Sequence, residues 1–508
     1  MNLLSSASVF GFYTLVSRVL GYLRDILIAV FLGTSVYADA FFVAFRLPNT
    51  FRRLFAEGTF NAAFIPSYSE QKIKGKKLGN KFADEVFNII SIFLILLIII
   101  IEIFTPFIVY IIAPGFYENL EKFNLAVEFT RITFPFLLFV SLSSLLSGIL
   151  NSNNKFAAAA AAPIVLNIVL ILSLFLSFYY DLDIAKSLSI GVTLSGIFQF
   201  IILLIFTRKF YFPSIFFIKK FNNNIKFFFK KLLPSIFSSG ITQINILIGT
   251  IIASFQSGAV SYLYYADRVY QINLAIAGIA VGTVALPNLA KNIKLKKQNI
   301  IDKLQNRSIE LCLLLSLPAA FGLLIASEQI VNSLFGYGSF NIEDIHYTSL
   351  ALIFFAFGVP AFALIKVLSN FYFARNDTKF PFYVSFITML INIIISLSFF
   401  KKYGFIIIPI ATSLSSWVAV LIYLIFLKKN KILFLSSEFI SNFLKILLST
   451  FLMSIFLYYG LNYFEDKFVY SNKFKLIYLL IMVGLSSALY LIVAKILGVL
   501  NLKSYKIK

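Results

Sequence analysis

Long apolar segments alternate with short polar loops along almost the whole chain. About twenty apolar residues in a helix cross the hydrocarbon core of a bilayer, and about fourteen segments reach that length. The predicted spans are residues 6–31, 37–66, 86–112, 124–150, 156–179, 185–207, 227–255, 260–289, 307–330, 345–372, 380–400, 404–428, 438–461 and 474–498. This pattern predicts an all-α, multi-pass membrane protein with about 14 transmembrane helices.

Composition agrees with this class. Of 508 residues, 60% are hydrophobic and only 13% are charged, with a mean hydropathy of +0.90, which excludes an ordinary soluble enzyme. Cys312 and His346 are the only residues of their types. An internal disulfide, a cysteine or histidine metal cluster and a histidine-dependent triad are therefore excluded.

The net charge of +22 comes largely from lysine-rich loops after the second, sixth and eighth segments. Loops after odd-numbered segments are mostly short and acidic or neutral, with Lys401 and Lys402 as the exception. The positive-inside rule then places both termini in the cytoplasm. These loops suit anionic membrane lipids, so we expect no nucleic-acid partner.

Arg18 interrupts the first apolar run, which predicts a retained helix instead of a cleaved signal.

Several landmarks recur at offsets of 220 to 225 residues, which predicts an internal repeat. DILI at Asp25 matches NILI at Asn245, and LNIVLILSL at Asn167 matches INIIISLSF at Asn392. Pro66 and Pro135 also have counterparts, at Pro287 and Pro360. We therefore expect two six-helix lobes related by pseudo-two-fold symmetry, at 1–220 and 221–430, with two appended helices in 431–508.

One stretch, residues 17–66, carries charges inside segments that otherwise read as membrane spans. Its members are Arg18, Arg24, Asp25, Asp39, Arg46, Arg52, Arg53 and Glu57. A charge at bilayer depth is costly and usually faces protein or a water-filled path. Arg18 and Asp25 are seven residues apart, so they share a helix face, whereas Pro48 can bend or break the second helix. Interfacial snorkelling, especially by Arg52 and Arg53, and structural ion pairs remain the alternative explanations.

The second copy contributes Asp267 and Arg268 at the equivalent region. We expect Arg18, Arg24, Arg52 and Arg268 to form a cationic cavity between the lobes, because arginine forks suit phosphate and carboxylate oxygens. The acids Asp25, Asp39, Glu57 and Asp267 would hold the arginines or exchange partners with them. The two appended helices either serve packing or form a groove for a hydrocarbon tail.

The chain contains the motifs SRVLGYLRD, ADAFFVAFRLPNTFRRLFAEGTFNAAFIP, YYADR and FARNDTKFP. These motifs resemble those of the MurJ (MviN) family of bacterial lipid II flippases. That family belongs to the multidrug/oligosaccharidyl-lipid/polysaccharide exporter superfamily. The resemblance implies a two-lobed transporter of the bacterial cytoplasmic (inner) membrane. Its expected substrate is lipid II, the undecaprenyl-diphosphate-linked disaccharide-pentapeptide. It implies essential cavity arginines at the four positions above, partner acids at the four acidic positions and a lipid-tail groove at the appended helices. We expect Asp25 to belong to the substrate-binding residues with the four arginines. We expect a gating or ion-pair role for Asp39, Arg53, Glu57 and Asp267.

The resemblance implies no catalytic residue and no enzyme activity, and we expect a monomer without a cofactor. Some relatives carry a sodium-binding acid in the seventh helix, at the position that is Gly249 here. Asn376 and Asp377 are weak candidates for a monovalent cation site, against the alternative of a polar turn. The alternative functions are a flippase for another lipid-linked oligosaccharide, a drug or cation antiporter of the same superfamily, and a glycosyltransferase using Asp181 and Asp183.

Overall fold

The computed structural model describes residues 3–56, 59–214, 223–274, 277–278 and 281–500, and these ranges contain helices and no strand. The chain divides into two compact units, Met1–Ser261 and Tyr262–Lys508. The all-α fold expected from the apolar segments is confirmed. The predicted lobe boundaries rest on the sequence repeat, whereas these units rest on spatial compactness.

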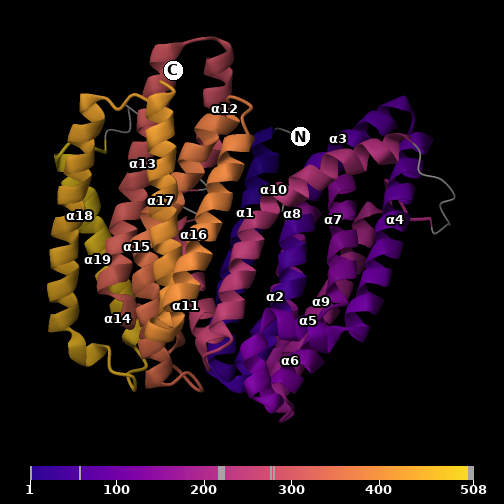
Figure 1. Cartoon of the computed structure of the whole chain (residues 1–508), viewed down its shortest axis with the longest axis horizontal. Coiled ribbons are helices and arrows are strands. Elements are labelled where there is room, and N and C mark those ends of the chain that lie inside the picture. The colour runs from indigo at the N-terminus through magenta and orange to yellow at the C-terminus, as the bar shows by residue number, and fades with distance from the viewer. Residues whose placement is uncertain (1–2, 57–58, 215–222, 275–276, 279–280, 501–508) are drawn as a thin grey trace. The chain divides into compact units, whose positions relative to one another are not determined.

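The first unit is built from ten α-helices and one short 3₁₀ helix (Figure 1). They are α1 (Leu3–Leu32), α2 (Val36–Ala56), α3 (Thr59–Lys74), α4 (Lys76–Ile103), α5 (Thr105–Ile112), η1 (Pro114–Glu118), α6 (Leu120–Thr133), α7 (Phe136–Ser152), α8 (Phe156–Tyr179), α9 (Ile184–Thr207) and α10 (Asn223–Ala253). Helix α1 packs on α8, α2 packs on α6, and α10 packs on α3.

The second unit continues with further helices (Figure 1). They are α11 (Ala259–Leu274), which starts within the first unit, α12 (Val281–Lys294), α13 (Gln298–Ile325), α14 (Ser327–Phe335), α15 (Ile342–Phe373), α16 (Lys379–Tyr403), η3 (Gly404–Ile406), α17 (Ile407–Lys429), α18 (Ser437–Tyr463), η4 (Glu465–Lys467) and α19 (Lys475–Ile496). Helix α15 packs on α13 and α17, and α18 packs on α13 and α19.

Each predicted apolar span overlaps a helix or a pair of consecutive helices. Several spans are divided, for example at Phe104 between α4 and α5 and at Ala326 between α13 and α14. Pro48, in contrast, lies inside α2 without ending it. Within the described ranges, nine helical segments are long and apolar enough to cross a membrane, and one of them, Lys379–Lys429, is 51 residues long. The count of fourteen therefore stays a prediction.

Many large apolar side chains face outward, as a lipid-embedded protein requires. On α19, Leu480 is 63% exposed and Ile492 is 56% exposed, and on α18 Leu444 is 59% exposed. Exposing this apolar surface to water would be unfavourable, whereas contact with lipid tails would not be. The outer faces of the appended helices thus suit the bilayer interior. The tail groove that the resemblance implies stays a prediction.

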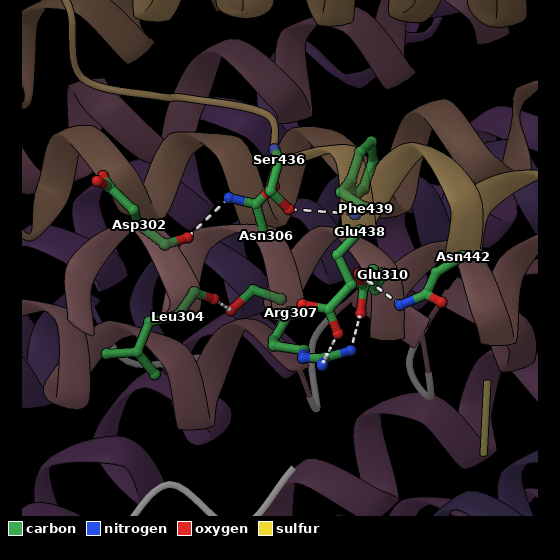
Figure 2. A network of polar contacts seen from close by, with 10 residues as sticks. Asp302, Leu304, Asn306, Arg307, Glu310, Ser436, Glu438, Phe439 and Asn442 are labelled. Carbon is green, nitrogen blue, oxygen red and sulfur yellow. Dashed lines mark hydrogen bonds and ion pairs between the residues drawn. The ribbon is translucent and has the colours of Figure 1, made fainter. Parts of the chain in front are cut away.

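The internal repeat is visible in matching hydrogen bonds. Asn119 caps α6 by accepting from the Lys122 amide at 3.1 Å, and Asn341, 222 positions later, caps α15 through the Asp344 amide at 2.9 Å. Asp84 of α4 accepts from the Ser214 amide at 2.9 Å. At the same offset, Asn306 of α13 accepts from the Ser436 amide at 3.1 Å (Figure 2). Equivalent residues therefore make equivalent contacts in both copies.

Next to Asn306, an ion-pair cluster joins α13 to α18, with Arg307 and Glu310 buried and Glu438 exposed at its edge (Figure 2). Arg307 donates to Glu310 and to Glu438, each at 2.6 Å, and Asn442 donates to Glu310 at 3.1 Å. Glu310 is only 2% exposed. Because a buried carboxylate is tolerated only with such partners, this cluster fixes the first appended helix to the repeat.

Replacing Asn306 with alanine should lower the stability of the second unit. Its side-chain amide donates to the carbonyls of Asp302 and Phe434, and its oxygen accepts from Ser436. Loss of these bonds should cost about 1–3 kcal/mol, measured as a lower Tm of the purified protein in detergent. The matched control is Asn292→Ala, which removes one exposed bond. Equal Tm values for both variants would contradict this assignment.

Candidate functional site

The first charged cluster lies between α1 and α8. Arg24 donates to Asp25 at 2.7 and 3.0 Å and to the Asn167 side-chain oxygen at 2.9 Å. Asn167 in turn donates to the Ser17 carbonyl at 2.8 Å. Arg24 and Asp25 are both buried, at 6% and 2% exposure. The guanidinium is therefore neutralised and oriented in this conformation.

Gly21 lies beside this contact, and a Cβ there would lie 3.4 Å from the Asn167 side chain, an ordinary van der Waals separation. Arg18, in contrast, is exposed on α1 and makes no ion pair with any described residue. The structure thus brings Arg24 and Asp25 together and leaves Arg18 apart. An exposed guanidinium is free to meet an anion directly, whereas Arg24 must first exchange a partner.

The second cluster surrounds Asp39, which is 0% exposed. Its carboxylate accepts from Lys122 of α6 at 2.5 Å and from the Gly258 amide at 2.9 Å. It also accepts from the amide and hydroxyl of Ser261, at 2.9 and 2.5 Å. Gly258 and Ser261 flank the start of α11, so Asp39 acts as a cap supplied by another helix. The positive end of the α11 dipole and the Lys122 ammonium both stabilise the negative charge.

The surroundings of this cluster are tightly packed. The Lys122 ammonium lies 4.3 Å from the centre of the Phe116 ring, a cation–π contact. The Gly115 amide donates to Ser254, and a Cβ at Gly115 would lie 2.4 Å from the Ser254 carbonyl oxygen. Helix α2, the η1–α6 segment and the α10–α11 turn therefore meet at one place. The loop charges predict that this place lies at the outer face of the membrane.

The other predicted residues of α2 are partly buried. Arg52 donates to the Asn49 side chain at 3.0 Å, and Arg53 lies beside it at intermediate exposure. Glu57 lies outside the described residues, so the expected pair of Arg53 and Glu57 is untested. Asp39 lies near the start of α2 and Arg53 near its end, fourteen residues later. The common face that the helical spacing predicts for them stays a prediction.

In the second unit, Arg268 lies over the Tyr264 ring at 4.5 Å and donates to its hydroxyl at 3.1 Å. Asp267, one position earlier, accepts from Gln271. Tyr264 thus positions the Arg268 guanidinium through both its ring face and its oxygen. A cavity shared by Arg268 and the arginines of the first unit stays a prediction.

The candidate cation residues lie in the turn before α16. Asp377 accepts from the amides of Lys379 and Phe380 at 3.0 and 3.1 Å, and Asn376 adopts a positive φ of 61°. This is the geometry of a helix-capping turn. Across the described part of the chain, no group of three or more His, Cys, Asp or Glu side chains could hold a metal ion.

Two contributors were missed from the sequence. Lys122 ends GFYENLEK, one of the acidic or neutral loops after odd-numbered segments. A lysine on the side that is expected to lack positive charge is itself a signal. Asn167 was recognised only as a repeat landmark, although an amide inside a membrane helix requires a partner. Both residues complete the partners of the charges that the sequence did identify.

Known proteins have similar sequences and a similar fold. The family model "Lipid II flippase MurJ" matches residues 28–479. A Rickettsia prowazekii protein named "Probable lipid II flippase MurJ" is 38% identical over 477 residues, which cover 92% of this chain and 93% of that protein. A protein of the same name from Rhizobium meliloti is 41% identical, covering 83% and 80% of the two chains.

Solved structures agree. "Lipid II flippase MurJ, inward closed conformation" superposes with a TM-score of 0.82 at 30% identity, covering 96% of this chain and 98% of that chain. An inward-facing multidrug resistance MATE transporter of the MOP superfamily shares the fold alone, with a TM-score of 0.64 at 13% identity over 80% of this chain and 98% of that chain. On this evidence the chain belongs to the lipid II flippase MurJ family.

Proposed function

We propose that this protein is a lipid II flippase of the bacterial cytoplasmic membrane. It would move the undecaprenyl-diphosphate-linked disaccharide-pentapeptide from the inner to the outer leaflet by alternating access. The observation that carries this proposal is the family match over residues 28–479. In this proposal the protein is a monomeric transporter without enzyme activity, and both termini are cytoplasmic.

The arginine chemistry supports a diphosphate as the group that is bound. Arg24 already holds a carboxylate, Asp25, in a fork of two hydrogen bonds. A diphosphate offers the same oxygen acceptors with more charge, so it can replace Asp25. Arg18, which is exposed, would attract the headgroup before this exchange. Arg52 and Arg268 are proposed to complete the site, with Asp267 as their acidic neighbour.

The Asp39 cluster supports a gating role at the outer face. Four hydrogen bonds to one carboxylate join α2, α6 and the start of α11. Such a cluster is stable only while its donors remain together, since separation would leave buried charges unpaired. We therefore assign Asp39 and Lys122 to the closure of the outer side, with Arg53 and Glu57 as further candidates at the inner part of α2.

The membrane potential can supply the driving force. Outward movement of roughly two negative charges across about 100 mV would release about 4–5 kcal/mol. Gly249 offers no side-chain oxygen for sodium, and Asp377 already accepts two amides. We therefore propose transport driven by the potential, with coupling to a monovalent cation as the alternative.

Arg24→Ala should reduce lipid II export at least about tenfold, because hydrogen bonds to a charged group are lost from the binding step. The measurement uses cells depleted of their own flippase and expressing this chain, with an external cleaving enzyme that reports outer-leaflet lipid II. Arg24→Lys, which retains charge without the fork, should be intermediate. Arg208→Gln, an exposed loop change, is the control. Normal export by Arg24→Ala would exclude this residue from the site.

Asp39→Asn should abolish export and destabilise the protein by about 3–5 kcal/mol, because the buried Lys122 loses its counter-charge. Adding Lys122→Met removes the unpaired buried ammonium, so it should restore much of the Tm. Export should not recover, because the proposed outer gate still lacks the ion pair between Asp39 and Lys122. Glu128→Gln is the matched control, since its ion pair with Lys186 is half-exposed on the same helix as Lys122. Full export by the double variant would show that the pair is structural only.

A flippase for another lipid-linked saccharide is the second candidate, because the diphosphate is common to both substrates. The flippase-depleted cells described above distinguish these two substrates. Restored lipid II cleavage by the unmodified chain supports lipid II, whereas good membrane expression without cleavage supports another saccharide. The MATE neighbours share the fold alone and add no support for drug transport.

A further inference from the structure

A fully buried lysine begins the last helix of the second unit and takes no part in the clusters described above. Lys475 is the first residue of α19 and is 0% exposed. No described carboxylate forms an ion pair with it. A buried ammonium without a counter-ion is costly unless other groups satisfy it. Neutral groups around it must therefore supply the stabilisation.

Three oxygen atoms and two rings surround this ammonium. It donates to the Asn332 side-chain oxygen at 2.8 Å, to the Gly336 carbonyl at 2.6 Å and to the Tyr470 carbonyl at 3.0 Å. These bonds use all three of its N–H donors. The ring centres of Tyr337 and Tyr470 lie 4.2 and 4.9 Å away, within reach of cation–π attraction. Lys475 therefore joins α19 to the segment that follows α14.

The groups that accept from the ammonium are themselves fixed. The Asn332 amide donates to the Phe468 carbonyl at 2.6 Å, so its oxygen is directed at the ammonium. A Cβ on Gly336 would lie 2.6 Å from the Asn332 backbone carbonyl oxygen, so a side chain there would displace the acceptors. The Tyr470 hydroxyl also donates to the Phe340 carbonyl at 3.1 Å. The connection between α18 and α19 thereby holds the 336–340 segment at both ends.

The 336–340 segment in turn packs on α11. Phe335 and Phe340 are both 0% exposed, and their ring centres lie 5.3 and 5.4 Å from that of Tyr265, which is also 0% exposed. Tyr265 lies four residues, about one helical turn, after Ser261. The amide and hydroxyl of Ser261 donate to Asp39. A chain of buried contacts thus leads from the ammonium to the start of α11.

The first copy has a neutral contact at the equivalent place. There the Gly115 amide of η1 donates to Ser254, in the turn between α10 and α11, at 3.0 Å. At the repeat offset of 222, Gly115 corresponds to Tyr337, and Ser254 corresponds to Leu476, next to Lys475. Each copy therefore packs this segment against the turn after the helix that follows the copy. In the second copy, a buried ammonium with three acceptors takes the place of one neutral hydrogen bond.

We propose that Lys475 is a positioning residue for lipid II transport. It fixes the 336–340 segment, which through Tyr265 fixes the start of α11, where Ser261 donates to Asp39. Loss of the ammonium would leave three buried oxygen atoms without a donor, which favours separation of α19 from the segment. The consequence for transport rests on the proposed function, whereas the hold on α11 can be measured without it.

The test measures cysteine reactivity at the start of α11 in the purified full-length protein. Val260, beside Ser261, is 1% exposed. A cysteine introduced by Val260→Cys should react slowly with a maleimide once Cys312, the only native cysteine, is removed by Cys312→Ala. Adding Lys475→Met should raise the labelling rate about tenfold, because the start of α11 opens more often. Lys473→Met, which changes an exposed lysine two residues earlier, is the control and should leave the rate unchanged.

Further variants separate positioning from a general loss of stability. Tyr265→Leu should raise the labelling rate to a similar extent, and its combination with Lys475→Met should add little, because both act through one chain of contacts. Asn306→Ala, which should lower the Tm of the second unit, should not raise the labelling rate. If Lys475→Met does not accumulate in the membrane, Tyr470→Phe carries the test. It removes the hydroxyl that bonds the 336–340 segment and should raise the rate about threefold.

Unchanged labelling with Lys475→Met or, where that variant does not accumulate, with Tyr470→Phe would overturn the inference. An equal increase with Asn306→Ala would also overturn it, because it would indicate a general loss of stability. In the flippase-depleted cells, Lys475→Met should lower export about fivefold. Lipid II binding in detergent should stay within about twofold, and a loss of binding in proportion to export would contradict a positioning role. If the unmodified chain exports no lipid II, the proposed function fails, and the labelling rates still decide whether Lys475 holds α11.

Discussion

The cost of charge in a low-dielectric interior governs this protein. Asp39 is completely buried and is tolerated because an ammonium, two amides and a hydroxyl all donate to it. Arg24 is buried because Asp25 and Asn167 take up its donors. Each of these buried charges therefore has a geometry that it cannot leave without acquiring a new partner. Partner exchange links the structure to transport, because a diphosphate is an alternative partner for arginine.

The same constraint explains how the two copies diverged. Both retain the contacts that hold their scaffolds, as in the pairs Asp84–Ser214 and Asn306–Ser436. At the capping positions they differ in charge, since Lys122 of the first copy corresponds to Asp344 of the second. Lys122 reaches Asp39, whereas Asp344 completes the local cap of its own helix. One copy thus uses this position for a long-range ion pair, and the other uses it for helix termination.

The sequence predicted the fold class well, because apolar length and loop charge are properties of the chain itself. The fifth span matches α8, at 156–179, and the repeat offset reappears in paired hydrogen bonds. The charged stretch of α1 and α2 contains the buried Arg24, Asp25 and Asp39, whereas its part in a substrate site stays a prediction. Partners distant in sequence could not be predicted. The contacts of Arg24 with Asn167 and of Asp39 with Ser261 join residues 143 and 222 positions apart, and spacing along a helix carries no information about them.

The most direct test uses vesicles in which this protein is the only protein. Fluorescent lipid II would be placed in the leaflet that corresponds to the cytoplasmic side, and its appearance in the other leaflet followed while a potential is imposed. The account predicts transfer by the unmodified chain, faster when the receiving side is positive, and loss of transfer with Arg24→Ala. Transfer that is independent of both the potential and Arg24 would contradict it.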